Sequence, residues 1–320
     1  MRLPTIDDIR DAAQRLKPFA METPLLESAV LNSKYGGRVF IKAETLQRTG
    51  SFKFRGAYNR LSALSEDESK RGVVAFSSGN HAQGVALAAR ELGVKAMIVM
   101  PTDAPSSKVA ATQAYGAEIV RYERLTEDRE AIARRLADER GLTLVPPYDH
   151  PLIMAGQGTA ALELIEEVDP LDWLLAPVGG GGLLSGCTIA ATGLVSEIRV
   201  VGVETETSND WVLSLRAGHP VRIPPPETIA DGMRTQQPGA LTFPIVQRLA
   251  HGILTVTDDE VKEAMRFLLL RMKLLVEPTG AVPFALLLTG RLQIEPRQRV
   301  GVILSGGNAD AELVAEVLRS

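Results

Sequence analysis

The sequence predicts an α/β fold in which helices cover mostly parallel sheets. Short runs of β-branched and other apolar residues alternate along the chain with longer segments of helical periodicity, which is the pattern of α/β proteins. Most of these runs are apolar throughout, as expected for strands buried on both faces of a parallel sheet. Several of them end in turns of glycine or small polar residues. Ligands of open α/β sheets bind beyond the carboxyl ends of the strands, so a site is expected at these turns.

The expected elements follow one another in a regular order. We expect strands at Val73–Phe76, Ala96–Met100, Glu118–Val120, Leu142–Val145, Trp173–Pro177, Arg199–Val203 and Val300–Leu304. Helical patterns lie at Ile6–Leu16, Asn80–Leu92, Ser107–Tyr115, Glu127–Glu139, Gly158–Val168 and Thr257–Met272. Two stretches interrupt the alternation. Gly50–Arg55 is a Gly-Ser turn that enters a helix, and the prolines of Arg222–Pro238 indicate a structured loop that crosses a cleft.

Composition restricts the class of protein. Of the 320 residues, 45% are hydrophobic, which is enough for a sizeable core, and the net charge of -4 does not favour nucleic acid or an anionic membrane as a partner. Cys187 is the one cysteine, so an internal disulfide is impossible and a reducing compartment is expected. The N-terminus has no apolar signal core, and no apolar run is long enough to span a bilayer. We therefore expect a cytoplasmic protein.

The strongest local signal is a run of four glycines. Gly179, Gly180, Gly181 and Gly182 follow the expected strand Trp173–Pro177 and lead into an apolar helix. Contiguous glycines let successive N–H groups point into one concavity, and at a helix N-terminus such a loop attracts a phosphate. The spacing is neither a Walker loop nor the dinucleotide fingerprint. A plain tight turn is the alternative, although four glycines cost backbone entropy with no packing gain.

Lys53 lies in a different turn, between Phe52 and Phe54 and beside small residues. A lone lysine at a helix start is usually a solvated surface charge, and by itself Lys53 would be interpreted in that way. An apolar surround, however, lowers the pKa of a lysine and frees its amine for imine chemistry. Lys53 is therefore a candidate nucleophile.

Two further turns follow expected strands. The first holds small or polar residues at a helix start, namely Ser77, Ser78, Gly79, Asn80 and His81. The serines and Asn80 could cap that helix while their N–H groups face a substrate carboxylate. A plain N-cap is the alternative, and a histidine at a helix start is more often structural than a base. The second turn begins with Ser305, directly after the expected strand Val300–Leu304.

Five motifs in order resemble one enzyme family. SFKFRGA, SSGNHAQG, VGGGGLLSG, VEPTGA and LSGGN are similar to motifs of the fold-type II pyridoxal 5'-phosphate (PLP) enzymes, the tryptophan-synthase-β-like group. The threonine/serine dehydratase and serine racemase branch is the most similar, and the resemblance covers essentially the whole chain. It implies two open, twisted, mostly parallel sheets flanked by helices. It also implies a large PLP-binding domain, residues 1–47 plus 146–320, with an inserted small domain, residues 48–145.

The resemblance also implies a role for each candidate residue. Lys53 would hold PLP as a Schiff base and move the Cα proton on one face of the substrate, with Phe52 beside the cofactor. Gly179–Gly182 would cradle the phosphate, Asn80 would hydrogen-bond the 3'-oxygen, and Ser305 would face the pyridine nitrogen. The substrate carboxylate would lie among Ser77, Ser78, Gly79, Asn80 and His81. In racemases of this branch, the serine at the position of Ser78 is the second acid/base, on the opposite face.

An acidic segment follows the expected strand Arg199–Val203. Relatives that are activated by divalent cations carry an acidic residue here, a backbone carbonyl four residues on, and an acidic residue six residues on. Glu204, Ser208 and Asp210 fit that spacing. Oxygen ligands that include carboxylates suit Mg²⁺ or Ca²⁺, not zinc. The alternative is a solvated acidic loop.

The resemblance implies β-elimination of water from L-threonine or L-serine, which gives a 2-oxo acid and ammonia, in a homodimer. A serine or aspartate racemase and a 3-hydroxyaspartate dehydratase are close alternatives. A non-catalytic PLP-binding protein on the same fold is another, but the complete set of motif residues argues against it. An acidic substrate would need a basic side chain near its distal end, for which Arg55, Arg121 and Arg234 are candidates.

Overall fold

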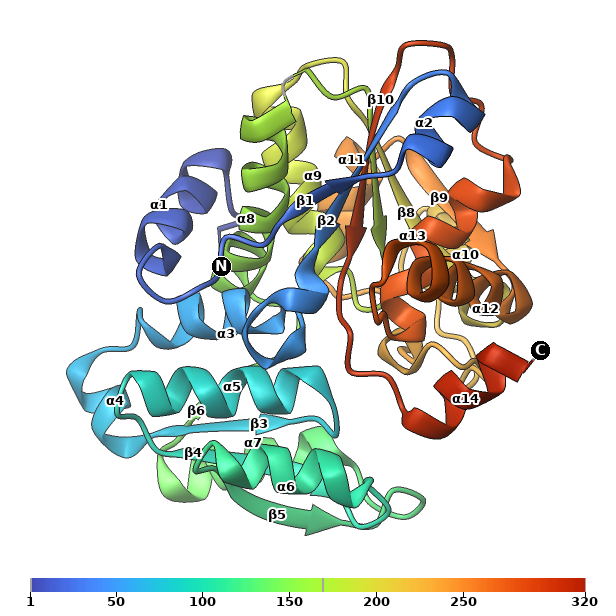
Figure 1. The fold of residues 1–320 in the computed structure, drawn as a ribbon. Coiled ribbons are helices and arrows are strands. Elements are labelled where there is room, and N and C mark those ends of the chain that lie inside the picture. The colour runs from blue at the N-terminus through green and yellow to red at the C-terminus, as the bar shows by residue number, and fades with distance from the viewer. Residues whose placement is uncertain (1, 169, 320) are drawn as a thin grey trace.

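Two sheets organise the computed structural model, which describes residues 2–168 and 170–319 (Figure 1). Within these residues the larger sheet has six strands in the order β1-β2-β10-β7-β8-β9, all parallel except β1. They are β1 (Leu25–Glu27), β2 (Arg38–Ala43), β7 (Trp173–Pro177), β8 (Arg199–Thr205), β9 (Gly252–Val256) and β10 (Arg299–Leu304). The smaller sheet is parallel, in the order β5-β4-β3-β6. Its strands are β3 (Val73–Phe76), β4 (Ala96–Pro101), β5 (Glu118–Tyr122) and β6 (Thr143–Leu144). The predicted α/β fold with two mostly parallel sheets is confirmed.

Side chains of the smaller sheet alternate between two buried clusters. One cluster packs against α5 (Asn80–Glu91) and contains Val73, Ala75, Ile98 and Met100. The other packs against α7 (Arg129–Arg140) and contains Val74, Phe76, Met97 and Val99. Because helices cover both faces, the central strands β3 and β4 are apolar at every position. Helices α4 (Glu66–Arg71) and α6 (Ser106–Ala114) complete this four-stranded unit (Figure 1).

The larger sheet lies between two helical layers. One layer shares a core with Leu174, Ala176 and Val200, and comprises α1 (Ile6–Leu16), α8 (Pro151–Val168), α9 (Gly182–Leu194), α10 (Asp210–Ala217) and α11 (Thr242–Leu249). The other shares a core with Leu175, Val201 and Val302, and comprises α2 (Ala29–Tyr35), α12 (Asp258–Phe267), α13 (Pro278–Thr289) and α14 (Ala311–Arg319). Helix α3 (Lys53–Leu61) lies where the two units meet (Figure 1). In the described part of the chain, no helix is both long and apolar enough to cross a bilayer.

Three strands and some helix ends differ from the prediction. Strands β1, β2 and β9 were not expected: β1 has three residues, β2 contains a buried lysine, and β9 is an edge strand with an exposed leucine. Short or charged edge strands carry a weak hydrophobic signal. Helix α8 begins at Pro151 and not at Gly158, because Gly158 packs within α8 against the backbone of Gly186 in α9. The predicted helix Thr257–Met272 divides into α12 and a π-helical turn, η5 (Leu268–Met272).

Candidate active site

The predicted turns meet in one cavity of about 870 Å³. Its wall includes every residue predicted to bind cofactor or substrate: Phe52, Lys53, Ser77, Ser78, Gly79, Asn80, His81, Gly179, Gly180, Gly181, Gly182 and Ser305. These residues follow the carboxyl ends of β3, β7 and β10, or begin α3. Parallel strands of both sheets therefore end at this cavity, as the general rule for α/β sheets requires.

Lys53 begins α3, and its amine lies in the cavity wall. Its Nζ donates to the carbonyl oxygen of Pro147 at 2.8 Å and lies 5.2 Å from the centre of the Phe52 ring. Burial lowers the pKa of Lys53 to about 8, although the charge of Glu277 acts in the opposite direction. A substantial fraction of the amine is thus neutral near physiological pH and can attack a carbonyl carbon.

The turn before Lys53 is tied to the turn after β10. Thr49 has a φ of 63°, a left-handed conformation that is uncommon for a β-branched residue. Ser51 forms an isolated antiparallel bridge with Gly306, and the Phe52 N–H donates to the Ser305 carbonyl at 3.0 Å. These bonds hold the unfavourable backbone of Thr49 in place and set Lys53 beside Ser305.

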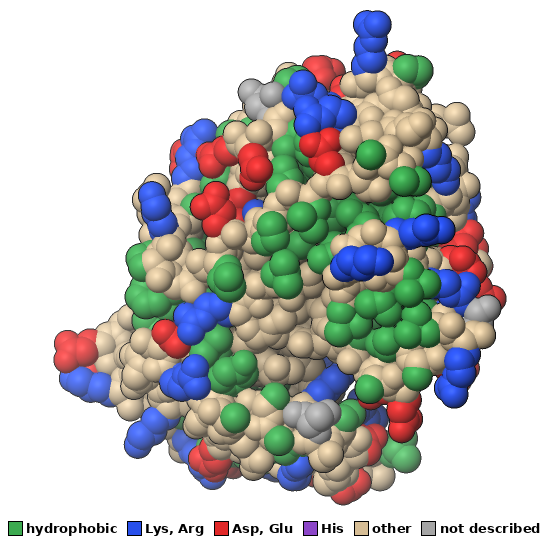
Figure 2. Space-filling model, in the orientation of Figure 1, with side chains coloured by type: hydrophobic (Ala, Val, Ile, Leu, Met, Phe, Trp, Pro, Cys, Tyr) green, Lys and Arg blue, Asp and Glu red, His purple; other side chains and the backbone are tan. Residues whose placement is uncertain are grey.

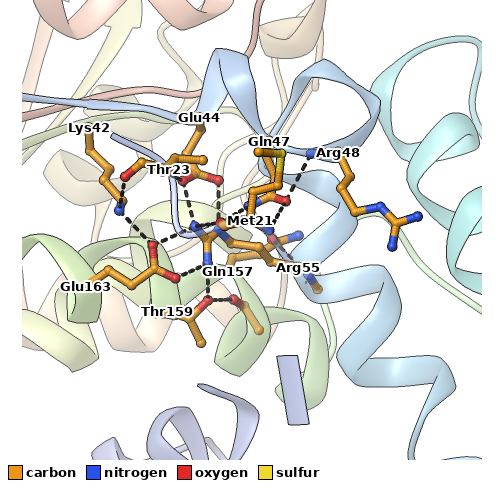
Figure 3. Close-up of polar contacts among 12 residues, drawn as sticks. Met21, Thr23, Lys42, Glu44, Gln47, Arg48, Arg55, Gln157, Thr159 and Glu163 are labelled. Carbon is orange, nitrogen blue, oxygen red and sulfur yellow. Dashed lines mark hydrogen bonds and ion pairs between the residues drawn. The ribbon is translucent and has the colours of Figure 1, made fainter. Parts of the chain in front are cut away.

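Arg55 does not reach the cavity, so its assignment as a candidate substrate arginine was wrong. Its side chain is fully buried in a cluster of four charges, which Figure 3 shows with its polar neighbours. The guanidinium donates to Glu44 at 2.7 Å and to Glu163 at 2.5 Å, and Glu163 also pairs with Lys42 at 2.6 Å. Glu44 lies in the 3₁₀ turn η1 (Glu44–Leu46), whereas Glu163 lies in α8. Arg55 thus anchors the helix that carries Lys53 to the six-stranded unit.

The four-glycine loop has no room for larger residues, as two of its positions illustrate. Gly181 has a φ of 95° and is the N-cap of α9. A Cβ at Gly180 would lie 2.3 Å from the ring of Tyr148, which also lines the cavity. The side chains of Trp211 and Thr242 donate to the carbonyls of Gly179 and Gly180. The loop therefore approaches the cavity closely at the N-terminus of a long helix, which is an arrangement that binds phosphate.

The Ser305 hydroxyl lacks a hydrogen-bond partner among the described residues, and a bound ligand could provide one. Its Oγ is buried and has no hydrogen-bond partner in the described part of the chain. A buried hydroxyl without a partner destabilises a fold by about 1–3 kcal/mol, yet this one lies in the wall of the cavity. A pyridine nitrogen would supply the missing partner. The glycine loop, the buried amine and this hydroxyl therefore fit PLP.

The turn after β3 is not capped by side chains, so that prediction was wrong. The N-cap of α5 is Gly79, without a side-chain cap, and the Ser77 hydroxyl accepts only from the Gly79 N–H, at 3.2 Å. The amide of Asn80 instead bonds to Glu277 and Asn308, on the six-stranded unit. Since no serine or asparagine side chain covers the first N–H groups of α5, these groups could bind a carboxylate.

His81 is held in one neutral form. Its Nε2 lies 3.0 Å from the carbonyl oxygen of Val145, which can only accept, so Nε2 carries the hydrogen. Burial, together with the charge of Lys53, lowers the pKa of His81 to about 3. This imidazole therefore joins α5 to the end of the β6 segment and is poorly suited to act as a base.

The cavity wall also contains residues that were not predicted, among them Tyr148, Glu277 and Arg129. Glu277 lies in VEPTGA, one of the five motifs, so its position in the sequence was a signal for it. Tyr148 and Arg129 stand in segments without a motif. Only the packing of the two units brings these two residues to the cavity.

The predicted cation ligands lie outside the cavity wall. Glu204 in β8 and Asp210 at the start of α10 are both buried. Glu204 accepts from the backbone N–H groups of Trp211 and Val212, whereas Asp210 Oδ2 has no partner among the described residues. Burial raises the pKa of Glu204 to about 9 and that of Asp210 to about 7. Among the described residues no cluster of three or more His, Cys, Asp or Glu could hold a metal ion, so this set offers two carboxylates only.

Comparison with known proteins identifies the family. The model described as pyridoxal-phosphate dependent enzyme matches residues 16–306. The chain belongs to this family. It is 54% identical over 319 residues, covering all of both chains, to the L-threo-3-hydroxyaspartate ammonia-lyase of Pseudomonas sp. It is 49% identical over 316 residues to the serine racemase of Schizosaccharomyces pombe, covering 99% of this chain and 98% of that one.

A solved structure agrees with these relatives. Serine racemase from Dictyostelium discoideum matches this PLP-dependent enzyme with a TM-score of 0.91 and 40% identity, over 96% of this chain and 99% of that one. The relatives of the enzyme are thus ammonia-lyases and racemases. The family, PLP dependence and reaction class that the motifs implied are confirmed.

Proposed function

We propose that this PLP-dependent enzyme is an ammonia-lyase that eliminates water from L-threo-3-hydroxyaspartate. This acidic substrate is one of the alternatives that the motifs left open, and the most similar relative described above carries that name. The observation that carries the proposal is Arg129, a cavity arginine whose side chain makes no hydrogen bond or ion pair within the described residues.

The basic residues of the cavity wall differ in their partners. Besides Lys53 they are Lys108, Arg124, Arg129, Arg222 and Arg234. Four of them are engaged: Lys108 with Asp231, Arg124 with Asp103, Arg222 with Gln236, and Arg234 with the carbonyl of Thr228. The side chain of Arg129 makes no hydrogen bond or ion pair within the described residues, and its guanidinium lies 5.8 Å from the centre of the Phe76 ring. Arg121, a candidate from the sequence, donates to the Pro101 carbonyl and is not in the wall.

The residues of the wall divide the work of elimination. PLP, when bound, withdraws electrons from the Cα of the substrate and so acidifies its C–H bond. The amine of Lys53 would take that proton, since burial has already lowered its pKa. The N–H groups at the start of α5 would hold the α-carboxylate. Arg129 would hold the second carboxylate through its planar pair of donors, which a substrate such as L-serine does not engage.

Arg129→Met is expected to lower kcat/KM for L-threo-3-hydroxyaspartate about 10- to 100-fold, because a charge-assisted hydrogen bond contributes about 1.5–3 kcal/mol. The kcat/KM for L-serine should change by less than about threefold. Keto-acid and ammonia release measure both. Arg124→Met is the matched control, since Arg124 lies in the turn shortly before Arg129 and also lines the cavity, but is paired with Asp103. Equal losses for both substrates would contradict the role of Arg129.

Racemisation is a second candidate activity, because Ser78 and Lys53 both line the cavity and two relatives are named serine racemase. Ser78→Ala is expected to remove racemisation of L-serine while most dehydration of the L-substrate remains, since Lys53 alone would take the proton from one face. Chiral chromatography and keto-acid detection on the same samples separate the two activities. Ser77→Ala is the neighbouring control. Equal loss of both activities in Ser78→Ala would contradict a two-face arrangement.

We also propose that Mg²⁺ or Ca²⁺ binds to Glu204, the Ser208 carbonyl and Asp210. The two carboxylates are buried and form no ion pair with a basic side chain in the described part of the chain, which supports this, since a cation would replace the protons that burial otherwise favours. EDTA is expected to lower the melting temperature. If the free cation was present at 100 times its dissociation constant, its removal should lower the free energy of unfolding by about 2.7 kcal/mol. The double variant Glu204→Gln and Asp210→Asn should not respond to EDTA or Mg²⁺. Identical melting of the parent enzyme in EDTA and in Mg²⁺ would exclude a stabilising cation.

The expected homodimer, two-domain division and cytoplasmic location remain proposals. The dimer is supported by apolar side chains on the face that α13 occupies (Figure 2). Leu270 and Leu275, near the start of α13, are 50% and 47% exposed, and Leu46 is 49% exposed. Thr45 and the backbone of Leu275 both flank Gly307, so these segments adjoin. Apolar clusters of this kind are typical of interfaces between subunits.

A further inference from the structure

A chain of side-chain hydrogen bonds crosses the cavity from one unit to the other. Asn80, the first residue of α5, belongs to the four-stranded unit, whereas Glu277 precedes α13 and Asn308 follows β10 in the six-stranded unit. Asn80 Nδ2 donates to Glu277 Oε1 at 2.7 Å. Asn308 Nδ2 donates to Asn80 Oδ1 at 2.9 Å and to the carbonyl oxygen of Thr49 at 2.7 Å.

The polarity of this chain is set at its backbone end. The Thr49 carbonyl can only accept, so the atom of Asn308 that faces it must be the amide nitrogen. That nitrogen faces Oδ1 of Asn80, and Nδ2 of Asn80 therefore faces Glu277. A flipped Asn80 would bring two amide nitrogens together. Since the Asn80 nitrogen carries two hydrogens and Glu277 takes one, the second N–H is left for a ligand in the cavity.

Glu277 does not contribute to the stability of the fold in the way that a buried residue usually does. It is 4% exposed, and no lysine, arginine or histidine forms an ion pair with it within the described residues. Burial, together with the charge of Asp231, raises the pKa of Glu277 to about 8. A buried acid without an ion-pair partner is destabilising. The Glu277 carboxyl therefore fits a task at the site better than a task in the core.

We propose that Glu277 is a positioning residue that acts through Asn80. By accepting one Asn80 N–H, it directs the other toward the 3'-oxygen of the bound cofactor, and it does so across the gap between the two units. The inference rests on PLP as cofactor and on the assignment of Asn80 to that oxygen. It does not depend on which amino acid is the substrate.

The test is a double-mutant cycle on the holoenzyme, read by the absorbance of bound PLP. Glu277→Ala and Asn80→Ala should each still attach PLP, because Lys53 is intact. Each should raise the dissociation constant of PLP about tenfold and shift the absorbance maximum and its pH dependence in the same direction. The double variant should shift no further than the larger single variant, because both remove one interaction. Glu277→Gln, which keeps an oxygen acceptor for Asn80, should restore the absorbance of the parent.

Two controls separate positioning from a general loss of structure. Asn308 contacts the same Asn80 amide from its other side. Asn308→Ala removes that contact and leaves Glu277 in place, so this variant should shift the absorbance in the same direction. It keeps the test possible even if Glu277→Ala fails to fold. Glu263→Ala removes an exposed acid from α12 and should shift nothing. Additive shifts in the double variant, or an unchanged absorbance in the folded Glu277→Ala and Asn308→Ala proteins, would overturn the proposal. A wrong substrate assignment would appear in the substrate panel alone and leave these spectra as expected.

Discussion

Lys53→Ala is expected to abolish covalent attachment of PLP and to reduce turnover by at least about 10³-fold, the scale of losing an acid/base group. The reason is that the Lys53 amine lines the same cavity as the four-glycine loop, Ser305 and the first residues of α5. Burial lowers its pKa to about 8, so attachment of PLP to the apo-protein should accelerate as the pH rises through about 8 and then level off. Absorbance of bound PLP and the mass of the protein after borohydride reduction measure attachment.

Lys108→Ala is the matched control for this experiment. Lys108 lines the same cavity, but its ammonium is paired with Asp231 at 3.1 Å. This variant should keep PLP attached and keep most of its turnover. A Lys53→Ala protein that is still modified by PLP after reduction, with the label on another lysine, would contradict the assignment.

Arg55→Met is expected to lower the free energy of unfolding by about 3–5 kcal/mol, the range for breaking a buried ion pair. The Arg55 and Glu44 side chains are both completely buried. Burial by itself would raise the pKa of Glu44, but the charge and hydrogen bonds of Arg55 hold it below its ordinary value. Without the guanidinium, Glu44 and Glu163 would lose their shared partner, and Glu163 would keep its ion pair with Lys42 (Figure 3). Urea unfolding of parent and variant at neutral pH measures the difference.

An exposed arginine provides the comparison for Arg55. Arg134 pairs with Glu130 on the surface of α7, with side chains that are 62% and 48% exposed. Arg134→Met should therefore cost less than about 1 kcal/mol, because solvent screens such pairs. If the free energy of unfolding of Arg55→Met lay within 1 kcal/mol of that of the parent, the buried ion cluster would not be what anchors α3.

The strands that the sequence revealed and those that it concealed differ in their surroundings. Val73–Phe76 and Trp173–Pro177 are covered on both faces, so apolar residues occupy every position and mark them clearly. Strand β2 contains Lys42, which is buried and pairs with Glu163. That partner is distant in the sequence, and no local pattern reveals it. The predicted side-chain cap of α5 was wrong for a similar reason, since the Asn80 side chain bonds to Glu277 across the cavity instead of to its own helix.

The sequence by itself indicated the chemistry of the site, because the strands, the glycine turns and the apolar neighbours of Lys53 are local patterns. It pointed to Lys53, the four glycines and Ser305, and the fold places all of them in one cavity. The tertiary structure alone decided where Lys53 and Arg55 point. They stand two residues apart in one motif, and on a helix such side chains diverge by about 200°. One therefore enters the cavity and the other a buried ion cluster, and only distant residues, Pro147 for the first and Glu163 for the second, distinguish the two environments.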